Sequence, residues 1–265
     1  MAAKNASANT NGHAVVIGGA RGIGESIVRR MAEDGWSVTI ADRLSAEVES
    51  LCDELRKQKH DVYGETVDIV STDHLEQLGK NLKKRAGTRG ITAAVNSVGI
   101  FDERAALMDT SLESFERMQK VNVVGAFLFS KMVVPLMSRN ASLVHIGSVN
   151  GKIAGKDLGA YKVSKAALHM LAKCLALELA PAPRNIRVNV VAPGWVDTPG
   201  ERAVMRAEGR AKVLDDPESA KFIPLGRRTA SSEIADAVAF LCSERGSAIT
   251  GQVLYVDCGI TATYP

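Results

Sequence analysis

The chain has 265 residues, of which 46% are hydrophobic and 24% charged, a composition typical of globular proteins. Its formal net charge is only +3, and it has no basic tract interleaved with aromatic residues, which argues against nucleic-acid binding. A chain of this length can bury most of its apolar surface without disulfides or metals, and it fits one large α/β domain as well as two small ones.

The sequence carries no pattern for metal ligation, disulfides or secretion. The four cysteines, at positions 52, 174, 242 and 258, are far apart and form no C-x-x-C pair, so we expect buried reduced thiols and no metal. Residues 1–12 are small and polar, which predicts a disordered tail and no secretory signal. The most apolar stretch, residues 121–137, is interrupted by Lys131 and Pro135, which favours a buried helix over a membrane span. We therefore expect a cytoplasmic protein without a membrane partner.

Strand-like and helical segments alternate along the rest of the chain. Strands are predicted at residues 13–18, 36–41, 61–69, 91–95, 142–146, 186–192 and 252–257. Helices are predicted from the glycine-rich turn at 19–24 to about residue 33 and at 45–59, 71–85, 111–137, 158–180 and 231–243. This alternation predicts a parallel sheet of about seven strands covered by helices on both faces, in a single domain over residues 13–265.

The first strand–turn–helix unit has the composition of a phosphate-binding loop. Glycines at Gly18, Gly22 and Gly24 let the backbone approach a pyrophosphate, and the helix N-terminus supplies N–H groups and a positive dipole. Asp42, at the end of the second strand, can accept hydrogen bonds from ribose hydroxyls and would repel a 2′-phosphate, which favours NAD over NADP. Taken singly, such a loop is as often a plain tight turn, and Asp42 could be only a turn residue.

A second stretch, residues 148–165, has the side chains for acid–base chemistry. Ser148 follows a predicted strand, and Tyr161 and Lys165 are four apart on a predicted helix, so they share one face. A neighbouring ammonium group is expected to lower the pKa of the Tyr161 phenol from about 10, which would make it a usable acid or base. Ser148 could hydrogen-bond the same substrate oxygen. A Tyr–Lys pair alone is a common pattern on half-exposed helices.

Together these stretches resemble the short-chain dehydrogenase/reductase family, from about residue 13 to 260. The glycine loop matches the family's T-G-x-x-x-G-x-G pattern, with Ile17 in place of Thr. Residues 96–99 match Asn-Asn-Ala-Gly in part, since Ser97 and Val98 differ. Residues 193–198 match P-G-x-V-x-T. Six motifs in the right order are far more specific than any one of them.

The resemblance implies a single Rossmann-type, doubly wound domain with a substrate lid at about 199–228. It implies four catalytic residues, which are Asn122, Ser148, Tyr161 and Lys165. Of these, Asn122 is expected to hold a water that links Lys165 to solvent. Residues expected to bind the substrate are Ser148, Asn150 and Tyr161.

The resemblance also implies a dinucleotide site. Its expected residues are Gly18, Arg21, Gly22, Ile23, Gly24, Asp42, Arg43, Asp68, Ile69, Asn96, Gly99, Tyr161, Lys165, Pro193, Gly194, Val196 and Thr198. Basic residues at the family positions of Arg21 and Arg43 often hold a 2′-phosphate and so favour NADP. We give Asp42 more weight, because its carboxylate would meet that phosphate directly, and we expect NAD.

The implied activity is interconversion of a secondary alcohol and a ketone, with NAD as cofactor and Tyr161 as general acid/base. Two alternatives stay open: an NADPH-dependent carbonyl or 3-oxoacyl thioester reductase, and a dinucleotide-sensing protein without turnover. The two long helices imply a homo-oligomer, dimer or tetramer. Basic residues near the expected pocket could attract an acidic substrate, although we favour ordinary solvated surface charge as their explanation; they are Arg104, Lys152, Lys156, Arg202 and Arg206.

Overall fold

The computed structural model describes residues 12–102, 104–210 and 212–263. Within these residues the strands form one seven-stranded parallel sheet in the order β3-β2-β1-β4-β5-β6-β7. The strands are β1 (His13–Ile17), β2 (Ser37–Asp42), β3 (Val62–Thr66), β4 (Ile91–Asn96), β5 (Met137–Ile146), β6 (Arg187–Pro193) and β7 (Val253–Val256). The predicted doubly wound sheet is confirmed; the tail predicted at residues 1–12 lies, except for Gly12, outside the described residues.

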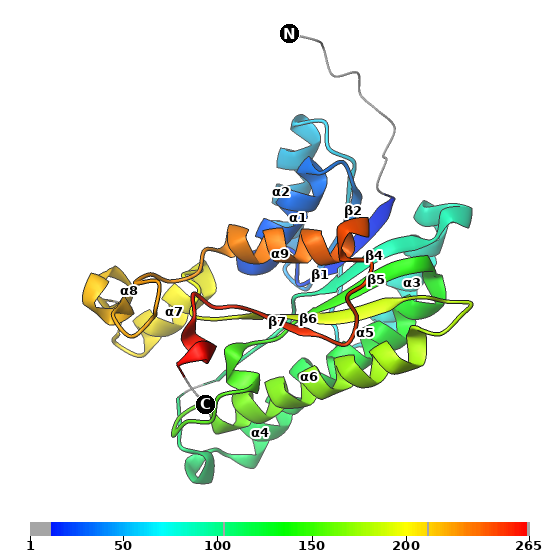
Figure 1. Cartoon of the computed structure of the whole chain (residues 1–265). Coiled ribbons are helices and arrows are strands. Elements are labelled where there is room, and N and C mark those ends of the chain that lie inside the picture. Colours follow the sequence, from blue (N-terminus) through cyan, green and yellow to red (C-terminus); the bar gives the residue numbers. More distant parts are fainter. Residues whose placement is uncertain (1–11, 103, 211, 264–265) are drawn as a thin grey trace.

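Helices cover both faces of this sheet (Figure 1). They are α1 (Gly22–Glu33), α2 (Ser45–Lys57), α3 (Thr72–Ala86), α4 (Leu112–Gln119), α5 (Gly125–Val133), α6 (Gly159–Leu179), α7 (Pro199–Ala207), α8 (Lys212–Asp215) and α9 (Ser231–Cys242). Helices α1, α2 and α9 pack on one face, while α3, α5 and α6 pack on the other. Helices α7 and α8 lie past the end of β6.

The central strands are buried on both sides. In β1, successive side chains point to opposite faces, so Val16 packs with Ile27 of α1 and Val15 packs with Phe129 of α5. Each of these four side chains has no exposed surface. This explains why the strands read as continuous apolar runs and not as alternating patterns.

The order of the strands places a ligand-binding crevice. The chain runs outward from β1 to β3 on one side and from β4 to β7 on the other, so the direction reverses between β1 and β4. In open α/β sheets, ligands bind at the carboxyl ends of the strands beside such a reversal. The loops that follow β1 and β4 meet there.

The structure corrects the predicted helix over residues 111–137. Helix α4 passes into a π-helical turn, Lys120–Val124, before α5 begins, and a 3₁₀ turn, Val134–Leu136, ends the segment. Pro135 cannot continue a helix because it lacks an N–H group. The strand β5 therefore begins at Met137, five residues before its predicted start at Ser142.

Two smaller expectations also change. The segment 199–228, for which no helix was predicted, contains α7 and α8, and α7 is capped by Thr198, whose hydroxyl accepts from the Glu201 N–H. The expectation of buried thiols holds for Cys52 and Cys242 but is wrong for Cys174, which is exposed on α6.

Within the described part of the chain, no helix has the length and apolar character needed to cross a membrane.

Candidate active site

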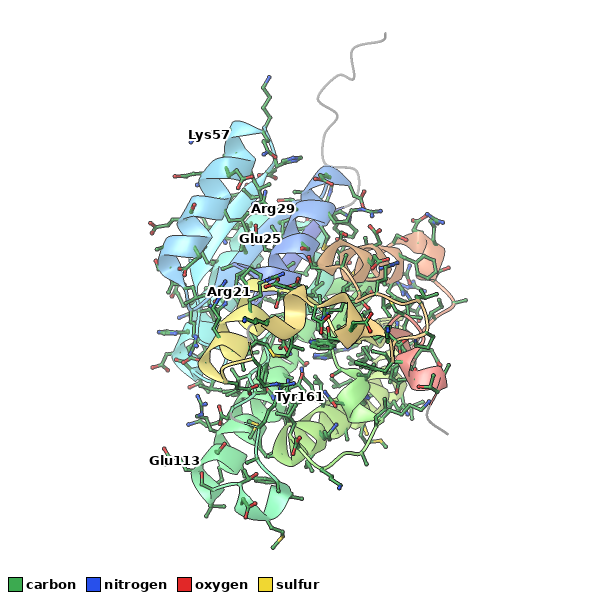
Figure 2. The ribbon with its side chains drawn as sticks, turned by 90° about the vertical axis from the view of Figure 1, so that its left-hand side faces the viewer. Arg21, Glu25, Arg29, Lys57, Glu113 and Tyr161 are labelled. Atoms are coloured by element: carbon green, nitrogen blue, oxygen red, sulfur yellow. The ribbon has the colours of Figure 1, made fainter. Side chains whose placement is uncertain are left out.

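A cleft of about 1030 Å³ opens at the carboxyl ends of the strands. Among its lining residues are all the predicted site residues except Asn96 and Asn122, which are buried beneath it. In Figure 2, Arg21 at the start of α1 and Tyr161 on α6 appear on either side of the yellow α7 segment. The cleft therefore joins the glycine loop to the predicted catalytic residues, and residues of the segment predicted as a lid, such as Glu201 and Met205, line it.

The glycine loop is shaped for close approach by a ligand. The Gly18 N–H donates to the Ala41 carbonyl at 2.8 Å, which ties the loop to the end of β2. Gly18 and Gly22 have φ of +78° and +61°, the left-handed region that glycine tolerates best. A Cβ at Gly24 would overlap the Gly18 carbonyl. The turn thus depends on glycines at these positions and presents the N-terminus of α1 to the cleft.

Asp42 lies beside this loop at the mouth of the cleft. One carboxylate oxygen accepts from the Ala20 N–H at 3.1 Å and the other from the Leu44 N–H at 3.2 Å. These two bonds hold the carboxylate between the loop and the end of β2. Arg21 and Arg43 line the same end, so both signs of charge predicted from the sequence are present there.

Ser148, Tyr161 and Lys165 converge in the cleft. Ser148 follows β5, and its hydroxyl hydrogen-bonds the Tyr161 phenol and accepts from the Asn150 N–H at 3.1 Å. Lys165 is almost fully buried, and its Nζ donates to the Ile146 carbonyl at 3.0 Å. A Cβ at Gly99 would lie 2.9 Å from this Nζ, so glycine there makes room for the ammonium group. Residues from three separate segments thus meet at one place.

The expected lowering of the Tyr161 pKa is wrong for this structure. Burial raises the pKa of Tyr161 to about 12, the Glu201 carboxylate adds to the rise, and the hydrogen bond with Ser148 offsets part of it. Lys165 Nζ lies 5.7 Å from the centre of the Tyr161 ring. Burial lowers the pKa of Lys165 itself to about 8. Burial therefore outweighs the lowering of the Tyr161 pKa by Lys165 that was expected from the sequence.

Asn122 supports the site from below. Its Oδ1 accepts from the Ile100 N–H at 2.8 Å, and its Nδ2 donates to the Ile100 carbonyl at 2.8 Å and to the Ser164 hydroxyl at 2.9 Å. The side chain is committed to these partners, so it joins the loop after β4 to α6. The water relay through Asn122 that the resemblance implies stays a prediction.

Asn96 and Asp68 hold turns next to the cofactor end. Asn96 Oδ1 accepts from the Val98 N–H at 3.0 Å, and Asp68 Oδ1 accepts from the Val70 N–H at 3.1 Å. Each residue therefore makes the strand-end turn that a non-functional interpretation would also predict. Asp68 and Ile69 nevertheless line the cleft.

The structure adds two residues that sequence reasoning missed. Lys162 Nζ donates to Asn150 Oδ1 at 2.5 Å, and burial lowers its pKa. Glu201 accepts from the Trp195 indole N–H at 3.2 Å and lines the cleft. Lys162 adjoins the Tyr–Lys pair in sequence, and Glu201 follows Thr198 in a T-x-x-E helix-start pattern. These patterns could have indicated their positions but not their contacts.

Two of the basic residues considered for an acidic substrate have partners of their own. Arg104 pairs with Glu201 at 3.7 Å and with Glu208 at 3.1 Å. Arg202 pairs with Asp197 at 2.6 Å and with Asp215 at 2.9 Å. These carboxylates already balance both guanidinium groups, which weakens the hypothesis of an acidic substrate.

Comparison with known proteins decides the family. A family model described as enoyl-(acyl carrier protein) reductase matches residues 18–261. The chain belongs to the short-chain dehydrogenase/reductase family. It is 38% identical over 246 residues to an uncharacterized short-chain type dehydrogenase/reductase of Sinorhizobium fredii, which covers 92% of this chain but only 43% of that longer relative.

Members of this family with named activities match along nearly their whole length. The chain is 34% identical to a galactitol 2-dehydrogenase of Rhizobium johnstonii, over 94% of both chains. It is 32% identical to a 3-oxoacyl-[acyl-carrier-protein] reductase of Thermotoga maritima, over 93% of this chain and 96% of that one. The aldohexose dehydrogenase of Thermoplasma acidophilum is a structural neighbour with 30% identity and a TM-score of 0.82, over 96% of both chains. As a short-chain dehydrogenase/reductase, the protein is an oxidoreductase that acts on CH–OH groups.

Proposed function

We propose that the protein interconverts a secondary alcohol and a ketone with NAD, using Tyr161 as general acid/base. The observation that carries this proposal is the meeting of Ser148, Tyr161 and Lys165 in one cleft with the glycine loop. The residues fit a dinucleotide, because the positive-φ glycines and the exposed N-terminus of α1 suit a pyrophosphate. When bound, the oxidised dinucleotide supplies the hydride acceptor and a positive charge.

The chain's own residues would orient the substrate and move its proton. The Ser148 hydroxyl and the Tyr161 phenol hydrogen-bond the substrate oxygen, and ionised Tyr161 removes the hydroxyl proton in the oxidation direction. Because burial holds the pKa of Tyr161 at about 12, positive charge beside the phenol is needed before it ionises near neutral pH. In the reduction direction, neutral Tyr161 gives the proton back to the carbonyl oxygen.

Asp42 supports NAD as the cofactor. Its carboxylate is held at the mouth of the cleft, and a 2′-phosphate close to it would meet a negative charge. The alternative is an NADPH-dependent carbonyl or 3-oxoacyl thioester reductase. Arg21 and Arg43 favour that alternative, since they line the same end of the cleft. Nothing in the described part of the chain favours a dinucleotide sensor without turnover.

Titration calorimetry with NAD and with NADP, at identical salt, tests the cofactor proposal. We expect tighter binding of NAD, and we expect Asp42→Ala to narrow the difference between the two affinities. Arg43→Ala is the matched control at the next position, and it should weaken NADP binding only. Tighter binding of NADP by the unaltered protein would support the reductase alternative.

An alcohol-oxidation screen then tests the reaction. We expect turnover of secondary alcohols, and we expect Tyr161→Phe to lose activity while it keeps its affinity for NAD. Dinucleotide binding without turnover on a broad alcohol and ketone panel would support the sensor. A cytoplasmic location stays a prediction, which fractionation of the source cells would test.

A further inference from the structure

Helix α6 carries a third polar residue on the face that bears Tyr161 and Lys165. His169 lies four residues after Lys165, so the three side chains form one stripe along the helix. His169 is buried, with only 6% of its surface exposed. Neither the sequence motifs nor the proposed mechanism gives this histidine a role.

The loop that carries Ser148 is built around the His169 imidazole. Gly147 and Gly151 flank this loop, and a Cβ at either position would overlap the imidazole ring. On another side, the Tyr255 ring of β7 meets the imidazole edge to face, with 6.5 Å between ring centres. The loop thus follows the shape of the imidazole closely, and two glycines make that approach possible.

A hydrogen bond joins this imidazole to the backbone of Ser148. The Ser148 N–H donates to His169 Nε2 at 3.4 Å. The acceptor must be an unprotonated nitrogen. Burial and the nearby Lys165 and Lys173 charges lower the pKa of His169 to about 4, so the ring is neutral near pH 7 and can accept. The hydrogen bond from Ser148 to His169 can therefore persist at neutral pH and hold the loop in place.

We propose that His169 is a positioning residue that holds Ser148 against the Tyr161 phenol. Helix α6 then places all three reacting groups: Tyr161 and Lys165 directly, and Ser148 through His169. This inference rests on the proposed function in one respect, because it takes Ser148 to be catalytic.

A double-mutant cycle tests the proposal. The variants are Ser148→Ala, His169→Leu and the pair, each compared by kcat, by KM and by its Kd for NAD. We expect His169→Leu to lower kcat on the order of 10- to 100-fold, since small misplacements of reacting groups have effects of that size, with the Kd for NAD unchanged. In the Ser148→Ala background the same change should lower kcat by less than about threefold, because residues that act as a unit are not additive.

His145 provides the matched control. It is a second buried histidine whose pKa burial lowers to about 4, but its ring contacts Asn96 and Ser130 and not Ser148. We expect His145→Leu to lower kcat, if at all, by the same factor with and without Ser148. His169→Gln, whose amide oxygen can reach the position of Nε2, should recover most of the kcat lost in His169→Leu.

Defined outcomes overturn the proposal. Equal fold losses from His169→Leu in both backgrounds would show that His169 acts independently of Ser148. A kcat for His169→Gln that is no higher than the kcat for His169→Leu would show that the hydrogen bond to Ser148 does not account for the loss. If thermal unfolding shows that His169→Leu is not folded, His169→Asn, whose amide stops short of Ser148, takes its place in the cycle. A Ser148→Ala variant with unchanged kcat would contradict the proposed function as well as this inference.

Discussion

Lys165 is a charged side chain held away from water, and its position opposes folding. Burial lowers its pKa from 10.5 to about 8, a difference that corresponds to about 3 kcal/mol between its two protonation states. The unfolded chain therefore binds the Lys165 proton more tightly than the folded one. The free energy of unfolding therefore falls by this amount as pH falls from about 10.5 to about 8, and below that range the full penalty is present. A group needed for catalysis thus lowers the free energy of unfolding.

Lys165→Met should stabilise the protein while it abolishes turnover. At pH 7 we expect the free energy of unfolding to rise by about 2 kcal/mol, because the loss of the hydrogen bond to Ile146 offsets part of the gain. The difference from the unaltered protein should shrink as pH rises above 8. Urea unfolding at pH 7 and pH 9.5 measures both quantities. Lys173→Met, at an exposed position on the same helix, should show no such pH dependence; a destabilised Lys165→Met protein at pH 7 would contradict this account.

At the scale of elements, Arg104 joins two walls of the cleft. It lies in the loop after β4, while its partners Glu201 and Glu208 lie in α7 and directly after it. Only 28% of the Arg104 side chain is exposed, so solvent screens these ion pairs less than it screens surface pairs. Glu201 also contacts Trp195. We expect this network to hold the predicted lid segment, residues 199–228, against the loop after β4.

Arg104→Met should loosen the lid. An ion pair of this kind contributes about 1 kcal/mol, so the open fraction should rise roughly fivefold. We expect faster proteolytic cleavage within residues 199–210 in the absence of substrate, together with a higher KM. Arg210→Met is the matched control, because Arg210 pairs with Glu208 at 3.2 Å but does not cross the cleft. Equal cleavage rates for the two variants would contradict the expectation that the ion pairs of Arg104 hold the predicted lid segment closed.

At the scale of the whole molecule, α6 turns an apolar stripe toward the outside. Val163, Met170 and Leu177 are exposed large apolar side chains seven residues apart, and Leu177 has 80% of its surface exposed. Val124, in the π-helical turn that packs on α6, and Phe127 of α5 are exposed in the same outer layer. Large apolar side chains gathered on one exposed helix face are typical of protein interfaces. We therefore propose that the protein is a homo-oligomer that associates through α5 and α6.

Leu177→Glu should dissociate this oligomer, because it would place a charge in an apolar interface. Sedimentation velocity should show a shift to the monomer, with the monomer still folded by circular dichroism. Lys57→Glu introduces the same charge on α2, over the other face of the sheet (Figure 2), and should leave the assembly unchanged. An unaltered protein that sediments as a monomer would remove the proposal.

Local patterns predicted much of the fold and part of the candidate site. The strand–glycine loop–helix unit and the Tyr161–Lys165 spacing depend on residues close in sequence, and the structure has both where they were expected. The break at Asn122 was not predicted, because it coincides with side-chain bonds to Ile100 and Ser164, which are distant in sequence. Helix α7 was missed because its surrounding segment has weak periodicity.

By itself the sequence determined the resemblance to the family, the strands and most of the helices, and which residue types reach the cleft, since these follow from short-range patterns. Only the tertiary structure decided that the pKa of Tyr161 rises, that Glu201 lies near it and that His169 supports Ser148. The physical reason is that desolvation and contact depend on which distant segments pack together. Tyr161 and Glu201 are 40 residues apart in the chain, so no local pattern could show that the Glu201 carboxylate raises the pKa of the phenol.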